Sequence, residues 1–188
     1  MTGFDNQPHL GDARLILRPL AAQDFDGLHA AANDPRVWAG HPAKDRHRRE
    51  IFAPYVDFLL EKGGTLVVID AARGAIIGCS RYYVAPDRPE AIAIGFTFLD
   101  ARYWGGEMNF RMKNLMLRHA FATYPEVWFH IDPTNTRSRK ATAKLGAVPA
   151  GHATLALGPT PADWMCYRLT REAWDATCAA RRSDRRST

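Results

Sequence analysis

One continuous stretch decides the fold: AIAIGFTFL (Ala91–Leu99), DARYWGGEMN (Asp100–Asn109) and FRMKNLMLRHAFATY (Phe110–Tyr124). The first part is apolar and predicts a strand, and the last part has the spacing of an amphipathic helix. Between them, Gly105 and Gly106 expose backbone N–H groups at the positive end of the helix dipole, which suits a phosphate or diphosphate. Neither GxxxxGK[ST] nor GxGxxG is present, so we expect a diphosphate held mainly by backbone.

The composition is that of one globular domain. The chain has 188 residues, of which 46% are hydrophobic and 24% charged. Three cysteines without CxxC spacing, Cys79, Cys166 and Cys178, favour a reducing compartment and argue against a zinc site. No apolar run approaches membrane-spanning length, and the start lacks the pattern of a signal peptide. We therefore expect a cytoplasmic protein without a metal.

The net charge of +5 is unevenly distributed, because four arginines crowd the last eight residues. We predict one domain over residues 1–178 and a basic, unstructured tail over residues 179–188. The tail is either a solvated end or a contact for nucleic acid or the ribosome, and its lack of aromatic residues favours the first. A second group of positive residues surrounds Arg137, Arg139, Lys140 and Lys144 and would attract an anionic ligand.

The remaining segments alternate between strand and helix patterns. Strands are expected at 14–20, 65–72, 75–84, 91–99, 127–132, 150–157 and 164–169, and helices at 21–33, 45–62, 110–124 and 136–145. This order predicts an α/β (α+β) fold with a mixed, mostly antiparallel sheet and helices on both faces. The helical crossover between the fourth and fifth strands makes them parallel neighbours in the centre.

Four segments in this order resemble the GCN5-related N-acetyltransferases, in particular the branch that contains the ribosomal-protein N-terminal acetyltransferases. They are RLILRPL (Arg14–Leu20), RYWGG (Arg102–Gly106), Pro133-Thr134-Asn135 followed by Ser138, and KLGA (Lys144–Ala147). The resemblance implies transfer of an acetyl group from acetyl-CoA to a primary amine, by direct attack in a ternary complex. The acceptor would be an amine-bearing small molecule or a peptide N-terminus, with no membrane or nucleic-acid partner, and the protein a monomer or homodimer.

The resemblance also implies where acetyl-CoA binds. The pyrophosphate would lie at the loop and the first helical turn, on Arg102, Gly105, Gly106, Met108 and Asn109. The pantetheine arm would enter where the two parallel strands splay apart, facing Phe98 and Leu99.

Three residues after the fifth strand have two interpretations each. Asn135 is a helix N-cap, and in the resembled family this asparagine also contacts the cofactor arm. Ser138 is, by the same resemblance, a candidate acid that protonates the departing thiolate, or simply a second capping hydroxyl. Arg139 is placed to meet the 3′-phosphate of the cofactor, or is a solvated surface residue.

Two departures from the family pattern affect function. Glu107 replaces a small residue of the phosphate loop, and its charge would weaken diphosphate binding unless its side chain points to water. The fourth strand offers Thr97 and no carboxylate as a base. Other candidates are Glu90, Asp132, His130, His29, His41 and His47. An α-amine with a pKa near 8 suits a site without a strong base better than a lysine does.

These departures keep two alternatives open. One is a non-catalytic acyl-CoA-binding or regulatory module, motivated by Glu107 and the missing base. The other is an RNA- or ribosome-associated protein that uses its arginine-rich tail.

Overall fold

The computed structural model describes residues 3–158 and 160–184. They form two compact units, unit 1 (Met1–Tyr83 and Ile94–His119) and unit 2 (Val84–Ala93 and Ala120–Thr188). Eight strands form a mixed sheet, and the strand β5 (Arg88–Leu99) contributes its first part to unit 2 and its second part to unit 1. None of the helices in the described part of the chain is both long and apolar enough to cross a membrane.

Unit 1 begins with an antiparallel meander in the order β1-β2-β3-β4. Its strands are β1 (Leu10–Gly11), β2 (Leu15–Pro19), β3 (Thr65–Asp70) and β4 (Ala75–Ala85). Its α-helices are α1 (Phe25–Ala32), α2 (Pro35–Trp38), α3 (Arg49–Lys62) and α4 (Met108–Ala120), with 3-10 turns η1 (Ala22–Asp24), η2 (Lys44–His47) and η3 (Ala101–Tyr103). The predicted hairpin of β3 and β4 is confirmed.

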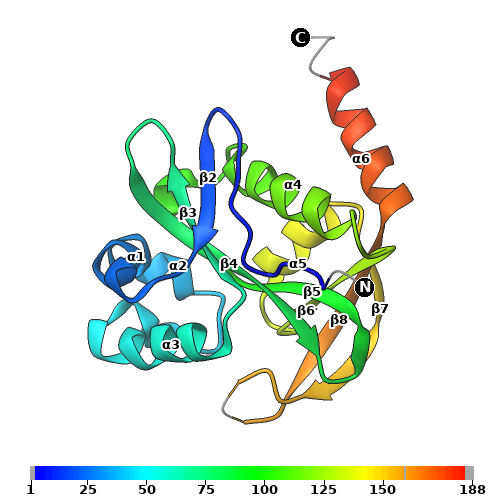
Figure 1. Ribbon diagram of the computed structural model, residues 1–188. Helices are drawn as coiled ribbons and strands as arrows, with labels where there is room; N and C mark the ends of the chain where they lie inside the picture. The colour runs from blue at the N-terminus through cyan, green and yellow to red at the C-terminus, as the bar shows by residue number, and fades with distance from the viewer. Residues whose placement is uncertain (1–2, 159, 185–188) are drawn as a thin grey trace. The chain divides into compact units, whose positions relative to one another are not determined.

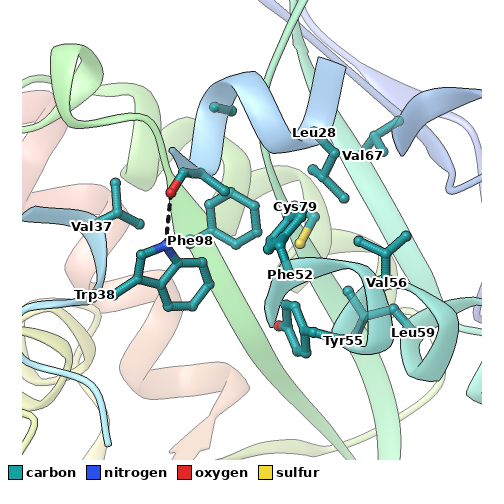
Figure 2. Close-up of a cluster of buried hydrophobic side chains, with 12 residues drawn as sticks. Leu28, Val37, Trp38, Phe52, Tyr55, Val56, Leu59, Val67, Cys79 and Phe98 are labelled. Carbon is teal, nitrogen blue, oxygen red and sulfur yellow. Dashed lines mark hydrogen bonds between the residues drawn. The ribbon is translucent and has the colours of Figure 1, made fainter. Parts of the chain in front are cut away.

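A buried aromatic and aliphatic cluster joins α1, α2 and α3 to one face of the sheet in unit 1 (Figure 2). Phe52 and Trp38 pack against Phe98 of β5, with ring centroids 6.0 and 5.2 Å away. The Trp38 indole N–H donates to the Ala32 carbonyl at 2.8 Å, drawn as the dashed line in Figure 2. Burial of these rings stabilises unit 1 through the hydrophobic effect.

The helix α4 covers the opposite face of the sheet in unit 1. Cys79 and Ser80 are neighbours on β4, so their side chains point to opposite faces. Cys79 belongs to the cluster of α1–α3, whereas Ser80 accepts a hydrogen bond from Lys113 of α4 at 3.1 Å. Figure 1 shows α4 apart from the group of α1, α2 and α3. Helices on both faces, as predicted, are therefore present within this unit.

Unit 2 holds the parallel pair. β5 and β6 (Glu126–Ile131) run parallel through Ile92↔Val127 and Ala93↔Trp128, which confirms the predicted crossover. β6 pairs antiparallel with β8 (Ala162–Thr170), and β8 with β7 (Val148–Leu155). The helices are α5 (Thr136–Ala143) and α6 (Arg171–Asp184).

Several element boundaries differ from the sequence-based expectations. The predicted helix over 45–62 is broken at Arg48, whose extended backbone (φ −82°, ψ 133°) separates η2 from α3. The predicted helix over 21–33 begins as the turn η1, because the Asp24 carboxylate binds the Ala21 N–H and both Arg18 Nη atoms. The helix after the glycine loop ends at Ala120 rather than Tyr124.

The end of the chain also differs from the expected tail. α6 continues to Asp184, so residues 179–184, including Arg181 and Arg182, are helical rather than unstructured. Residues 185–188, with Arg185 and Arg186, lie outside the described part of the chain. The domain boundary at residue 178 stays a prediction.

Candidate functional site

The glycine loop connects β5 to α4 within unit 1 and is built by local contacts. Asp100 caps the turn η3 by accepting the Arg102 N–H at 2.9 Å, and the Trp104 indole N–H donates to the Leu99 carbonyl at 2.9 Å. Gly105 has φ 74°, a conformation that favours glycine. A Cβ atom added at Gly105 or Gly106 would meet no atom within 4 Å, so a ligand can approach the backbone closely. α4 begins two residues later, and its dipole favours an anion at the loop.

The predicted pyrophosphate residue Arg102 is held by a buried carboxylate. Its Nη2 lies 2.5 Å from Oδ2 of Asp100, and its side chain is otherwise 77% exposed. Burial opposes ionisation of Asp100, but the hydrogen bonds from Arg102 keep the pKa of this carboxyl below its usual value. A hollow of about 330 Å³ lies beside this pair. It is lined by Ala30, Ala31, Asn33, Asp34, Arg36, Asp100 and Arg102.

The end of β5 carries Phe98 and Leu99, the residues expected at the pantetheine arm. Both side chains are buried, Phe98 in the aromatic cluster. Phe96, two residues earlier, has φ 51°, which is strained for a residue with a side chain. On β4, a Cβ atom at Gly78 would lie 2.1 Å from the Phe98 carbonyl oxygen, so this strand pair requires glycine. The backbone is therefore irregular where β5 approaches the loop.

The unexpected loop residue Glu107 points its carboxylate along α4. Its Oε2 lies 3.4 Å from Nη2 of Arg111, one helical turn later, and 43% of its side chain is exposed. Arg111 Nη1 also donates to Asp12 at 3.0 Å. The charge of Glu107 is thus partly compensated, which reduces its repulsion of an anion at the loop.

Sequence reasoning missed a buried lysine behind β5. Lys113 of α4 is 6% exposed, and its Nζ donates to Oγ1 of Thr97 at 2.8 Å and to Oγ of Ser80 at 3.1 Å. Burial lowers its pKa to about 7. The signal was present in the sequence, because Lys113, Met116, Leu117 and Ala120 follow the i, i+3, i+4, i+7 spacing of a buried helix face.

In unit 2, the predicted residues gather at the start of α5. Asn135 Oδ1 accepts the Ser138 N–H at 3.1 Å, which confirms the expected N-cap. Arg139 is tied into its own unit, since it donates to the Tyr167 hydroxyl at 3.2 Å and to the Pro133 carbonyl at 3.0 Å. Its guanidinium is therefore less available to a phosphate than a solvated arginine would be.

A second titratable group in unit 2 includes His130, one of the candidate bases. His130 and Cys166 are paired across β6 and β8, and His130 Nε2 lies 3.9 Å from Oδ1 of Asp87. The three potential ligand atoms lie within 4.8 Å of one another, close enough to hold one cation. Burial lowers the pKa of His130 and raises that of Cys166, so both are neutral near pH 7.

Comparisons with known proteins identify the family. Residues 14–148 match the family described as "Acetyltransferase (GNAT) domain". A GCN5-related N-acetyltransferase from Brucella melitensis has a TM-score of 0.78 and 18% identity, covering 96% of this chain and 86% of that one. A putative acetyltransferase from T. thermophilus has a TM-score of 0.71 and 26% identity, covering 94% and 97%. RimJ of Mycobacterium smegmatis, in complex with CoA-disulfide, has a TM-score of 0.66 and 19% identity, covering 92% and 94%. Comparison with the curated proteins finds no match.

The chain therefore belongs to the GNAT acetyltransferase family, as its sequence motifs indicated. It is an acyltransferase with acetyl-CoA as its cosubstrate. Of the predicted residues, those from Phe98 to Asn109 lie together in unit 1, and Asn135, Ser138 and Arg139 lie together in unit 2.

Proposed function

We propose that the protein transfers the acetyl group of acetyl-CoA to the α-amine of a peptide or small molecule, by direct attack in a ternary complex. The observation that carries this proposal is the open glycine loop at the start of α4. Gly105 and Gly106 leave the backbone accessible, and the nearby carboxylate of Glu107 is paired with Arg111. In this proposal, the N–H groups of the loop hold the pyrophosphate, together with Arg102, Met108 and Asn109.

The choice of an α-amine rests on the absence of a carboxylate among residues 91–99 of β5. An α-amine with a pKa near 8 is about one-tenth neutral at pH 7, whereas a lysine with a pKa near 10.4 is almost fully charged. A site without a strong base therefore favours the α-amine. Attack on the thioester carbonyl forms the amide, the amine loses one proton, and the CoA thiolate gains one.

We assign the proton for the thiolate to Ser138, and a contact with the cofactor arm to Asn135. Ser138 is half-buried, and its backbone N–H is already used by Asn135, so its hydroxyl is the group left for catalysis. Ser138→Ala should lower kcat by about tenfold or more with little change in melting temperature. An unchanged kcat would leave Ser138 with a structural role only.

The family also supports proposals about setting. We propose a cytoplasmic enzyme, consistent with the free thiols of Cys79 and Cys166, that acts as a monomer or homodimer. The likeness to RimJ, solved with CoA-disulfide, supports a CoA thioester as donor.

The test is a calorimetric titration of the purified chain with acetyl-CoA, followed by thiol release with amine acceptors. Micromolar binding, with faster thiol release on N-terminal peptides than on matched peptides whose only amine is a lysine side chain, is the expected result. Binding without turnover on any amine would favour a regulatory acyl-CoA-binding module. A faster rate on the lysine side chain would overturn the choice of α-amine.

A further inference from the structure

An arginine lies against the aromatic cluster of unit 1. Arg46 belongs to η2, and its Cζ lies 3.9 Å from the ring centroid of Tyr55 and 5.5 Å from that of Trp38. Its side chain is half-buried, and burial lowers its pKa. Desolvating a guanidinium has a cost, which stacking on aromatic rings offsets only in part.

The guanidinium of Arg46 has no carboxylate to balance it. Within residues 3–158 and 160–184, no ion pair and no side-chain hydrogen bond of Arg46 is found. Arg49 offers a direct contrast three residues later. It also stacks on an aromatic ring, with its Cζ 4.5 Å from the Phe25 centroid, but its Nη2 is paired with Asp26 at 2.6 Å. Five N–H donors in a planar fork are therefore available at Arg46.

A second cation increases the positive potential of the cluster. Arg81 of β4 lies 5.1 Å from the ring centroid of Phe96, and its side chain donates to the carbonyls of Gly63 and Lys62 at the end of α3. Tyr55 experiences the charges of both Arg46 and Arg81. Burial raises the pKa of Tyr55 above its usual value and that of the Cys79 thiol to about 12, so neither supplies a compensating negative charge at neutral pH.

The cluster connects this charge to the strand that leads into the glycine loop. The Tyr55 ring centroid lies 6.1 Å from that of Trp38, which lies 5.2 Å from that of Phe98. We propose that Arg46 binds an anionic group, a carboxylate or a phosphate, of the molecule whose amine is acetylated. This inference rests on the proposed acetyl transfer and adds to it the chemical class of the acceptor, an amine that also carries a negative charge.

The experiment measures binding separately from turnover. Acceptor pairs that differ only in the anion are titrated into the protein saturated with CoA: the dipeptide amides Ala-Asp and Ala-Asn for a carboxylate, and phosphoethanolamine and ethanolamine for a phosphate. The wild type should bind at least one anionic member about 10- to 100-fold more tightly than its neutral partner, as expected for charge-assisted hydrogen bonds. Which pair shows the preference identifies the anion.

Two variants assign the preference to Arg46. Arg46→Met keeps an apolar contact with Tyr55 and should abolish the preference, by weakening binding of the anionic member while leaving that of the neutral member. Arg49→Met, the matched stacked but paired arginine, should retain it. Melting temperatures of both variants report whether the fold is intact.

Two results would overturn the inference: equal binding of anionic and neutral members by the wild type, or a preference that survives in Arg46→Met. Failure of the proposed function has a different signature, namely no binding of acetyl-CoA to the wild type in the absence of any acceptor.

Discussion

The Nζ atom of Lys113 lies 2.8 Å from Oγ1 of Thr97, and Ser80 Oγ lies 2.7 Å from that same hydroxyl oxygen. A lysine, rather than an apolar residue, thus occupies the face of α4 that packs on the sheet. The contact partners are two hydroxyls and no carboxylate, so nothing there stabilises the ammonium by charge. The burial that lowers the Lys113 pKa to about 7 consequently makes folding depend on pH.

We predict that the free energy of unfolding rises with pH between about 7 and about 10.4 because of Lys113. In this window the unfolded chain retains the proton on this lysine and the folded chain has lost it, so higher pH favours folding by up to about 1.4 kcal/mol per unit. Lys113→Met should remove the dependence and raise stability at pH 7 to 8, because Ser80 and Thr97 still bond to each other. Urea unfolding of both proteins from pH 6.5 to 9.5 measures this. Parallel pH profiles would contradict it.

The sequence predicted the elements around the loop because their signals are local. Apolar residues of β5, the glycine pair and the spacing of α4 each depend on neighbouring residues only. The break at Arg48 was not predictable in this way, because both η2 and α3 have helix-forming sequences and only the extended backbone of one residue separates them. The ion pair of Arg111 with Asp12 joins residues 99 positions apart, which no periodicity reveals.

The functional residues divide along the same line. Asn135 was recognised as a cap because its partner, Ser138, is three residues away. Lys113 stood in an apolar stripe but was read as an ordinary surface lysine of an amphipathic helix. Arg46 gave no sequence signal at all, because its environment is formed by Tyr55 of α3 and Trp38 of α2.

The pairing of Glu107 with Arg111 predicts which substitution weakens acetyl-CoA binding. Glu107→Gln should change the affinity by less than about threefold, because the charge is already compensated. Arg111→Met should weaken it by about three- to tenfold, since an unpaired carboxylate near the pyrophosphate costs on the order of 1–2 kcal/mol. The double variant should recover most of the loss. Calorimetry at low salt measures all four proteins, and a large gain in Glu107→Gln would instead identify this residue as a block.

The two loop glycines should respond differently to alanine. Gly105→Ala should destabilise the protein by about 1 kcal/mol, since φ 74° is unfavourable for alanine. Gly106 lacks such a positive φ and has no neighbour within 4 Å of an added Cβ, so Gly106→Ala should leave the melting temperature unchanged or slightly higher.

The same pair tests the site. The methyl group of Gly106→Ala stands where a phosphate would approach the backbone, and we expect the affinity for acetyl-CoA to fall by about tenfold or more. Calorimetry and thermal melts on both variants check this. Unchanged affinity in Gly106→Ala would place the diphosphate elsewhere.

Asn135 can be tested for a role beyond the cap of α5. Asn135→Ala should lower stability by about 1 kcal/mol, because the Ser138 N–H loses its acceptor. Serine is an equally good N-cap but has no amide group, so Asn135→Ser should restore the melting temperature. If the amide also contacts the cofactor arm, as we propose, Asn135→Ser should keep a KM for acetyl-CoA several-fold above that of the wild type. Recovery of both the melting temperature and the KM in Asn135→Ser would restrict Asn135 to capping, since a hydroxyl would then replace everything that the amide does.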